Sequence, residues 1–414
     1  MSKTKDRDTV RALAGRLAEL AALPVQQERI EGWKRINGLQ PHRPMIWITE
    51  IPFGEFENDV DELRPVCEDK RLRSVEAQLR RRIFHELYLQ TDEVVTDCLD
   101  VPKRILGADF GVKADERTIK QGGTYIVSHE YHAVIRDFPD IEKIRMPEVS
   151  YDEEATLEAV EYLKDLLGDI LRVRAAGVRQ HFFAGWDVLV TLTGVTRALV
   201  DLVERPDFIH AIMRRMTDAT LARMTQLEEQ GLLDDSNPLR RVGSGGAGWT
   251  DGLPQADAEA GRLRLIDQWG GATPQIFSEV SPQMHEEFAL AYENEIMQRC
   301  GLNYYGCCEP LHNKMHLMAK VPRLRKISIS PWCDVQKAGE RAAQPYVFSH
   351  KPSPAILAED KFDPVRAEAD LRARLEHSAG MPCEIIMKDI STVRGDVRRL
   401  IDWCRIARKV ARAA

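Results

Sequence analysis

Two adjacent cysteines followed by a glutamate form the sharpest chemical feature of the chain. Cys307, Cys308 and Glu309 follow the apolar and aromatic run Leu302–Tyr305 after a single glycine, and this run predicts a strand. Thiolates are nucleophiles and metal ligands, and carboxylates transfer protons or bind metals. Neighbouring side chains on an extended chain point in opposite directions, so we expect one thiol to face a site and the other to pack. The alternative is that both thiols are small buried core groups.

Charged or titratable residues also follow two other apolar runs. Lys388 and Asp389 come after Ile385–Met387, and His350 comes soon after Tyr346–Phe348. A charged pair directly after a buried strand costs free energy unless it faces a polar pocket or forms a closing salt bridge. His350 is predicted to be an acid, a base or a ligand, or else a turn residue that caps the next helix.

Helical patterns and short apolar runs alternate along the chain. Residues 1–40 carry helical periodicity, and residues 41–414 alternate apolar runs with helical patterns as one domain. This order predicts the α/β class and a (β/α)8 TIM-type barrel with an N-terminal helical extension. Chemistry in that fold lies at the carboxyl ends of the strands, where we also place Asp97. The segment Gly243–Gly248 is predicted to be a mobile loop over the barrel mouth.

The composition excludes several classes of protein. The chain has 58 Lys and Arg against 65 Asp and Glu, a formal net charge of −7, unlike the basic excess typical of nucleic-acid binders. Its apolar stretches are shorter than the roughly 20 residues that span a membrane. Eight cysteines in 414 residues do not indicate a disulfide scaffold. The charged N-terminus lacks the apolar core of a signal peptide, so we expect a soluble, cytoplasmic protein.

Four segments of the chain, in order, resemble motifs of one known family. They are HRPMIW (His42–Trp47), VVTDCLDVP (Val94–Pro102), FAGWDVLVTLTG (Phe183–Gly194) and FSEVSPQMHEEFALAYENEI (Phe277–Ile296). Each is similar to a segment of the uroporphyrinogen decarboxylase superfamily, which also contains corrinoid-dependent methyltransferases. The resemblance extends over residues 40–410. It implies a (β/α)8 barrel and leaves a homodimer open.

One departure from the decarboxylase concerns the segment Thr49–Glu57. The decarboxylase has an arginine here that binds substrate carboxylates, whereas this chain has three glutamates and no arginine. A tetra-acidic porphyrinogen would meet repulsion instead of bidentate pairing, so we do not expect uroporphyrinogen decarboxylation. Asp97 does match the position of the decarboxylase's active-site aspartate.

The zinc-binding pattern of the methyltransferase branch is also changed. That branch often places His-x-Cys after one strand and a further Cys after the last strand. In this chain the histidine is missing, and the last-strand position falls near Asp389 instead of on a cysteine. A replacement zinc site of Cys307 or Cys308 with Glu309 and Asp389 is chemically feasible, and a metal-free site competes with it.

The resemblance implies a methyltransferase that moves a methyl group from a small O-, N- or S-methyl compound to a corrinoid (cobalamin) carried by a partner protein. Glu309, Asp389 or a bound metal would then supply a proton or Lewis acidity. The alternative hypothesis is a metal-free decarboxylase or lyase that acts on a small carboxylate with Asp97, Lys388 and His350. A third hypothesis is a non-catalytic binding protein that has kept the barrel.

Overall fold

Seven parallel strands form the main sheet. The computed structural model describes residues 2–120, 127–259, 261–378 and 380–414. The order across the sheet is β1-β13-β12-β11-β10-β9-β8, so the first strand lies next to the last. The strands are β1 (Met45–Ile48), β8 (Gln180–Phe183), β9 (Trp269–Ala272), β10 (Leu302–Tyr305), β11 (Leu324–Ile329), β12 (Val347–His350) and β13 (Cys383–Met387). Nearly all of their residues are buried, which is typical of a parallel sheet covered on both faces.

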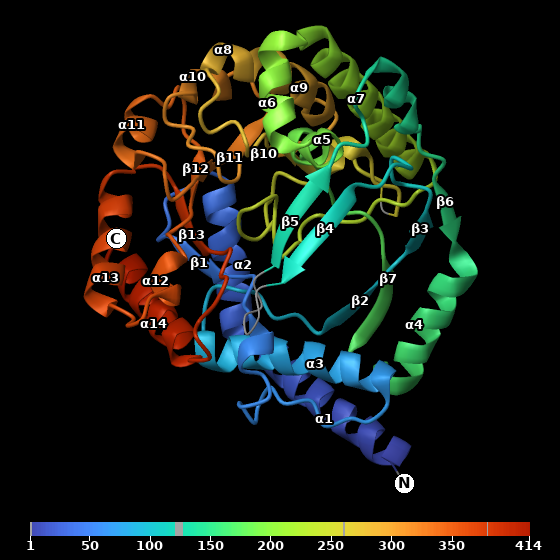
Figure 1. Ribbon diagram of the computed structural model, residues 1–414. Coiled ribbons are helices and arrows are strands. Elements are labelled where there is room, and N and C mark those ends of the chain that lie inside the picture. The colour runs from blue at the N-terminus through green and yellow to red at the C-terminus, as the bar shows by residue number, and fades with distance from the viewer. Residues whose placement is uncertain (1, 121–126, 260, 379) are drawn as a thin grey trace.

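Helices precede the sheet, follow most of its strands and lie around its outside (Figure 1). Two helices, α1 (Ser2–Ala21) and α2 (Pro24–Asn37), confirm the predicted N-terminal helical extension. The later helices are α3 (Lys70–Phe84), α4 (Glu153–Leu167), α5 (Gly185–Thr193), α6 (Val195–Glu204), α7 (Pro206–Glu229), α8 (Pro282–His285), α9 (Ala291–Met297), α10 (Met315–Met318), α11 (Val335–Glu340), α12 (Ala355–Ala358), α13 (Pro364–Glu376) and α14 (Arg398–Ala413). Within the described ranges, no helix combines the length and the apolar character needed to cross a bilayer.

Three short ladders lie outside the main sheet. They pair β2 (Cys98–Pro102) with β7 (Arg172–Ala176), β3 (Arg104–Leu106) with β6 (Ser150–Asp152), and β4 (Asp115–Lys120) with β5 (Val127–His132). Only the β2–β7 ladder is parallel. In the part of the chain that the structure describes, no ladder joins β8 to β1. The α/β class and the parallel sheet are therefore confirmed, and closure into an eight-stranded barrel stays a prediction.

The side chains of β13 alternate between two environments. Ile385 and Met387 belong to the apolar cluster that β13 shares with α14, whereas Ile386 belongs to a different cluster with Trp33 of α2. Glu384 lies on the same side of the strand as Ile386, because the side-chain period of a strand is two. A carboxylate therefore faces the interior enclosed by the sheet.

A buried ion pair compensates this carboxylate. The Nζ of Lys326, on β11, lies 2.8 Å from the Oε2 of Glu384, and neither side chain is exposed to solvent. The ammonium lies 5.5 Å from the ring centre of Trp33 and 5.7 Å from that of Trp269, at cation–π distance. Although burial opposes it, Lys326 and then Lys351 hold the pKa of Glu384 below its ordinary value. The interior of the sheet thus contains a matched pair of charges.

The segment Gly243–Gly248 packs against this pair instead of covering the mouth. The backbone N–H of Gly246 donates to the Oε1 of Glu384 at 2.9 Å. A Cβ added to Gly246 would lie 2.4 Å from the ring of Trp33, and one added to Gly245 would lie 2.4 Å from the Oε1 of Glu384. Only a bare backbone fits so close, so the glycines serve packing, and the position predicted over the mouth is wrong.

Removing the lysine of the buried pair is expected to destabilise the protein strongly. Lys326→Met leaves the carboxylate of Glu384 buried without its partner, which should lower the free energy of unfolding by about 3–5 kcal/mol. Lys337→Met breaks an ion pair of similar length, 3.0 Å to Asp334, between two half-exposed side chains. It should cost at most about 1 kcal/mol. Urea unfolding compares the two variants, and equal losses would contradict the assigned role of the pair.

The close approach of Gly246 gives a second stability prediction. Gly246→Ala forces a Cβ against Trp33 and should cost about 1–3 kcal/mol. Gly15→Ala is the matched control, because a Cβ at this position in α1 meets no atom within 4 Å. It should stabilise the helix by about 0.5–1 kcal/mol. Thermal unfolding gives both values, and a Gly246→Ala protein as stable as the parent would show that the segment lies elsewhere.

Candidate functional site

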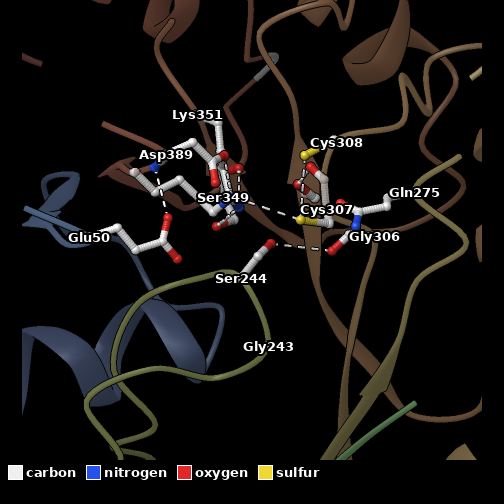
Figure 2. A network of polar contacts seen from close by, with 12 residues as sticks. Glu50, Gly243, Ser244, Gln275, Gly306, Cys307, Cys308, Ser349, Lys351 and Asp389 are labelled. Carbon is white, nitrogen blue, oxygen red and sulfur yellow. Dashed lines mark hydrogen bonds and ion pairs between the residues drawn. The ribbon is translucent and has the colours of Figure 1, made fainter. Parts of the chain in front are cut away.

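Thiols and amines from three strand ends meet at one end of the sheet (Figure 2). Cys307 and Cys308 follow β10, Lys351 follows β12, and Lys388 and Asp389 follow β13. The Nζ of Lys388 lies 3.9 Å from the Sγ of Cys307, and the two sulfur atoms lie 3.6 Å apart. Lys388 also forms an ion pair with the neighbouring Asp389. The structure therefore brings together four of the residues that the sequence singled out, and adds Lys351.

Backbone turns with positive φ aim these side chains. Gly306 has a φ of 92°, and the non-glycine residues Glu50 and Asp389 have φ values of 55° and 56°. Left-handed conformations are uncommon for non-glycine residues and concentrate at functional sites. The backbone N–H of Asp389 donates to the Oε2 of Glu50 at 2.8 Å, which ties the end of β13 to the end of β1 (Figure 2). Glu50 in turn pairs with Arg241 at 2.5 Å.

The two thiols ionise very differently. The hydrogen bond from Cys308, followed by the charges of Lys388 and Lys351, lowers the pKa of Cys307 to about 6 against the effect of burial. The same hydrogen bond raises the pKa of Cys308 far above the ordinary value of a thiol. At neutral pH the pair is therefore a Cys307 thiolate that accepts from a Cys308 thiol. A half-buried thiolate beside an ammonium group has the environment of a reactive cysteine.

Lys351 is a buried amine next to this thiolate. Its Nζ donates to the hydroxyl of Tyr304, to the Oγ of Ser349 at 2.6 Å and to the carbonyl of Ser349 at 3.0 Å. Burial lowers the pKa of Lys351 to about 7, although Glu384 and Cys307 oppose the shift. The amine is thus close to half-protonated at neutral pH. The sequence analysis assigned the chemistry at this strand end to its neighbour, His350.

The glycine-rich segment reaches the same cluster through one hydroxyl. The Oγ of Ser244 lies 2.9 Å from the hydroxyl of Tyr304 and 3.3 Å from the carbonyl of Gly306, to which it donates (Figure 2). Tyr304 therefore links Ser244 to Lys351. The residues that fill the interior and those at the strand ends form one polar network.

Two protonatable carboxyl groups lie beside Cys307. Burial, and secondarily the Cys307 thiolate, raises the pKa of Glu309 and of Asp187 to about 7 each. Glu309 is fully buried and accepts from the Oγ1 of Thr273 at 3.1 Å and from the backbone N–H of Cys307 at 3.0 Å. Asp187, in α5, accepts from the Nε2 of Gln275 at 2.8 Å, and its Oδ1 has no hydrogen-bond partner in the described structure. Both groups can donate a proton near neutral pH.

Sequence reasoning missed Asp187. It lies four residues after the end of β8, in the first turn of α5, within the segment FAGWDVLVTLTG that carries the family resemblance. Asp187 could have been found if the end of β8 had been predicted at Phe183. Polar residues just past the carboxyl end of a strand are the first candidates for a functional site in a parallel sheet.

His350 does not belong to this cluster. Its Nε2 lies 2.9 Å from the Oγ of Ser378, and its ring contacts Phe348 edge-on, on the side of β12 that faces away from the interior. Burial lowers the pKa of His350 to about 3, so it is a neutral core residue. Alternation along β12 turns Ser349 to the inside and His350 to the outside, which corrects the predicted site role.

Asp97 is also away from the cluster. It precedes β2, whose ladder begins at Cys98, so it stands at the amino end of a strand and not at a carboxyl end as predicted. Its half-exposed carboxylate pairs with Arg172 at 2.8 Å. That pairing is sufficient to explain the residue structurally.

The predicted zinc ligands are not arranged as a metal site. Across residues 2–120, 127–259, 261–378 and 380–414, no three His, Cys, Asp or Glu side chains are grouped so that they could hold a metal ion. The carboxylate of Glu309 binds Thr273 and the Cys307 backbone, and that of Asp389 binds Lys388. The residues as they lie do not fit zinc. The groups that can do chemistry at this site are the thiolate, the amines and the carboxyl groups.

Comparisons with known proteins find likenesses among solved structures only. No family model and no curated protein matches the chain. Among solved structures that match, a methyltransferase from Methanosarcina mazei is 12% identical with a TM-score of 0.48, and the alignment covers 91% of this chain and 96% of that one.

The thiolate assignment predicts selective alkylation. At pH 6, Cys307 should react with iodoacetamide much faster than Cys98, which is equally half-buried but whose pKa is raised by burial and then by Asp100. Lys388→Met removes the nearest cation and should slow Cys307 about fivefold for a one-unit rise in its pKa, because fewer thiols are then ionised. Peptide mass spectrometry measures both rates.

Lys337→Met is the control, because the side chain of Lys337 is half-exposed and pairs with Asp334, and it should leave both rates unchanged. Alkylation of Cys98 as fast as that of Cys307 would contradict the thiolate assignment of Cys307. An unchanged Cys307 rate in Lys388→Met would show that Lys388 does not set the charge of this thiol.

Proposed function

We propose that the protein is a methyltransferase that takes the methyl group from a small O-, N- or S-methyl compound. The acceptor is a corrinoid carried by a separate partner protein, which supplies the nucleophile. The family resemblance of the sequence favours this reaction. The observation that carries it here is the pair of carboxyl groups, Asp187 and Glu309. Their pKa values of about 7, raised by burial and then by the Cys307 thiolate, leave each about half-protonated at neutral pH.

Methyl transfer from an ether, a thioether or an unprotonated amine leaves an anion. The electron pair of the broken bond stays on the oxygen, sulfur or nitrogen, and a nearby acid can protonate it as the bond breaks. Asp187 is the better donor, because its Oδ1 has no partner, whereas both oxygens of Glu309 are engaged. Glu309 then acts as a positioning residue that holds the backbone of Cys307.

The Cys307 thiolate has an electrostatic part in this proposal. Its negative charge is one cause of the raised pKa of Asp187 and of Glu309, so it favours the protonated form of both carboxyl groups. Lys388 holds that negative charge in place, and the thiolate and Asp389 hold the pKa of Lys388 above its ordinary value although burial opposes this. The site thus contains a proton that Asp187 can donate and an ion pair between Lys388 and the Cys307 thiolate.

The alternative decarboxylase or lyase receives less support from the placement of residues. It relied on Asp97, Lys388 and His350, and only Lys388 lies in the cluster. Lys351 and Lys388 still place two amines in the cluster, and a protonated amine can pair with a substrate carboxylate. Release of carbon dioxide is therefore the outcome that would favour this alternative.

A methylation assay tests the proposal. Anaerobic protein, reduced free cobalamin and a panel of methyl ethers, methylamines and methyl thioethers are mixed, and formation of methylcobalamin is followed by absorbance. Asp187→Asn should lower the rate by about 10²–10⁴-fold, because it removes the proton donor. Asp218→Asn is the matched control, since Asp218 is half-exposed on α7 and pairs with Arg214. It should retain the parent rate.

The pH profile gives a separate check of the donor. Asp187 must be protonated to act, so the rate should be constant below pH 7 and fall as the pH rises through about 7. A rate that rises over this range, or carbon dioxide release from carboxylates without methylation from any donor in the panel, would contradict the proposal.

A further inference from the structure

A cavity of about 770 Å³ lies beside α3, between β1 and the β2–β7 ladder, and arginines line much of it. Its volume falls within the range of about 300–1,000 Å³ that is typical of small-molecule sites. The lining arginines come from α3, β7, the turn before β8 and the segment before the glycines. They are Arg82, Arg172, Arg174, Arg179, Arg240 and Arg241.

Five of these arginines are already neutralised by carboxylates. The pairs are Arg172–Asp97, Arg174–Asp234, Arg179–Asp100, Arg240–Glu93 and Arg241–Glu50. A further lining carboxylate, Asp235, accepts the backbone N–H of Asn237 at 2.9 Å. Two more lining carboxylates, Glu93 and Asp100, act on Arg82 through their charges, but each forms its ion pair with another arginine. Among the described residues, Arg82 is therefore the lining arginine that has no ion pair with a carboxylate.

Arg82 has only backbone partners. Its guanidinium donates to the carbonyl of Thr96 at 2.9 Å and to that of Cys98 at 3.5 Å. Within the described residues, no carboxylate lies within ion-pair distance of it. Burial and then the neighbouring charge of Arg240 lower the pKa of Arg82, although the charges of Glu93 and Asp100 oppose the shift. A guanidinium that faces a cavity without a counter-ion is a binding site for a planar anion.

Tryptophan rings form the apolar part of the same cavity. Trp33, Trp47 and Trp249 line it. The indole N–H of Trp47 donates to Glu93 at 3.2 Å, and that of Trp33 donates to the carbonyl of Asp92 at 2.7 Å. Trp33 and Trp47 are buried, with 1% and 4% of their surfaces exposed, whereas Trp249 is half-buried. Trp249 is therefore the ring that offers most of its surface to a flat apolar body.

We propose that this cavity binds a small molecule with a flat apolar body and a single carboxylate, which pairs with Arg82 while the body lies against Trp249. We infer a single carboxylate because one lining guanidinium, that of Arg82, lacks a carboxylate partner in the described part of the chain. The proposal rests on the cavity alone and stands whether or not the Cys307 cluster transfers methyl groups.

Calorimetric titration with naphthoate tests this proposal. Naphthoate should bind saturably, and neutral naphthamide, of the same shape, should bind at least about tenfold more weakly, since a charged hydrogen bond contributes about 1.5–3 kcal/mol. Arg82→Gln should weaken naphthoate binding to the same degree, and Arg82→Lys should recover part of it. Arg73→Gln, an exposed arginine of α3 outside the cavity, is the matched control and should not change binding.

Thermal unfolding of the unaltered protein tests binding without any substitution, so its result does not depend on whether the Arg82 variants fold. Naphthoate should raise the melting temperature and naphthamide should not, because only a ligand that binds the folded state stabilises it. Equal binding of naphthoate and naphthamide, no saturable binding of either, or full binding by Arg82→Gln would overturn the proposal. Inorganic phosphate binding more tightly than naphthoate would overturn the part assigned to Trp249.

Discussion

The buried ion pair between Lys326 and Glu384 is the constraint on which the rest of the structure depends. Two fully buried charges, 2.8 Å apart, are tolerated only when every remaining polar contact is supplied. Glu384 receives those contacts from the Oγ of Ser349 at 2.6 Å and from the backbone of Gly246 at 2.9 Å. The strand β12 and the glycine-rich segment are thereby held in place, and both continue to the end of the sheet where the thiols lie.

The site at that end works through balance among charges. Ser349 binds both Glu384 and Lys351, so the buried pair positions the amine that faces the Cys307 thiolate. The thiolate favours the protonated state of Asp187 and Glu309, and the charged state of Lys388. Changing one member should therefore shift the pKa values of the others, as expected for coupled titrations. Neighbouring acids and bases with displaced pKa values are typical of functional sites.

Much of this arrangement could be predicted from the sequence, and the failures have physical causes. The positions of Cys307, Glu309 and Lys388 after strands were enough to place them together, because carboxyl ends of parallel strands share one edge. His350 was assigned to the site because the sequence does not fix the side-chain alternation at the end of β12. A shift of one residue decides which neighbour faces inward, and Lys351 lies in the cluster instead. The glycine-rich segment was assigned to the surface because glycine usually indicates a turn, whereas here the absence of a Cβ lets backbone reach Glu384. Nothing in the local pattern around Lys326 indicates its partner, 58 positions away.

Titration of the Cys307 thiol tests most directly whether the cluster holds a fixed negative charge. The ultraviolet absorbance of thiolate, measured from acid to mildly alkaline pH in the parent protein and in Cys307→Ser, gives the ionisation of this residue by difference. We predict a transition with its midpoint near pH 6. A midpoint near the ordinary thiol value of about 8.5 would contradict the account, because the thiolate could then neither pair with Lys388 nor keep Asp187 protonated at neutral pH.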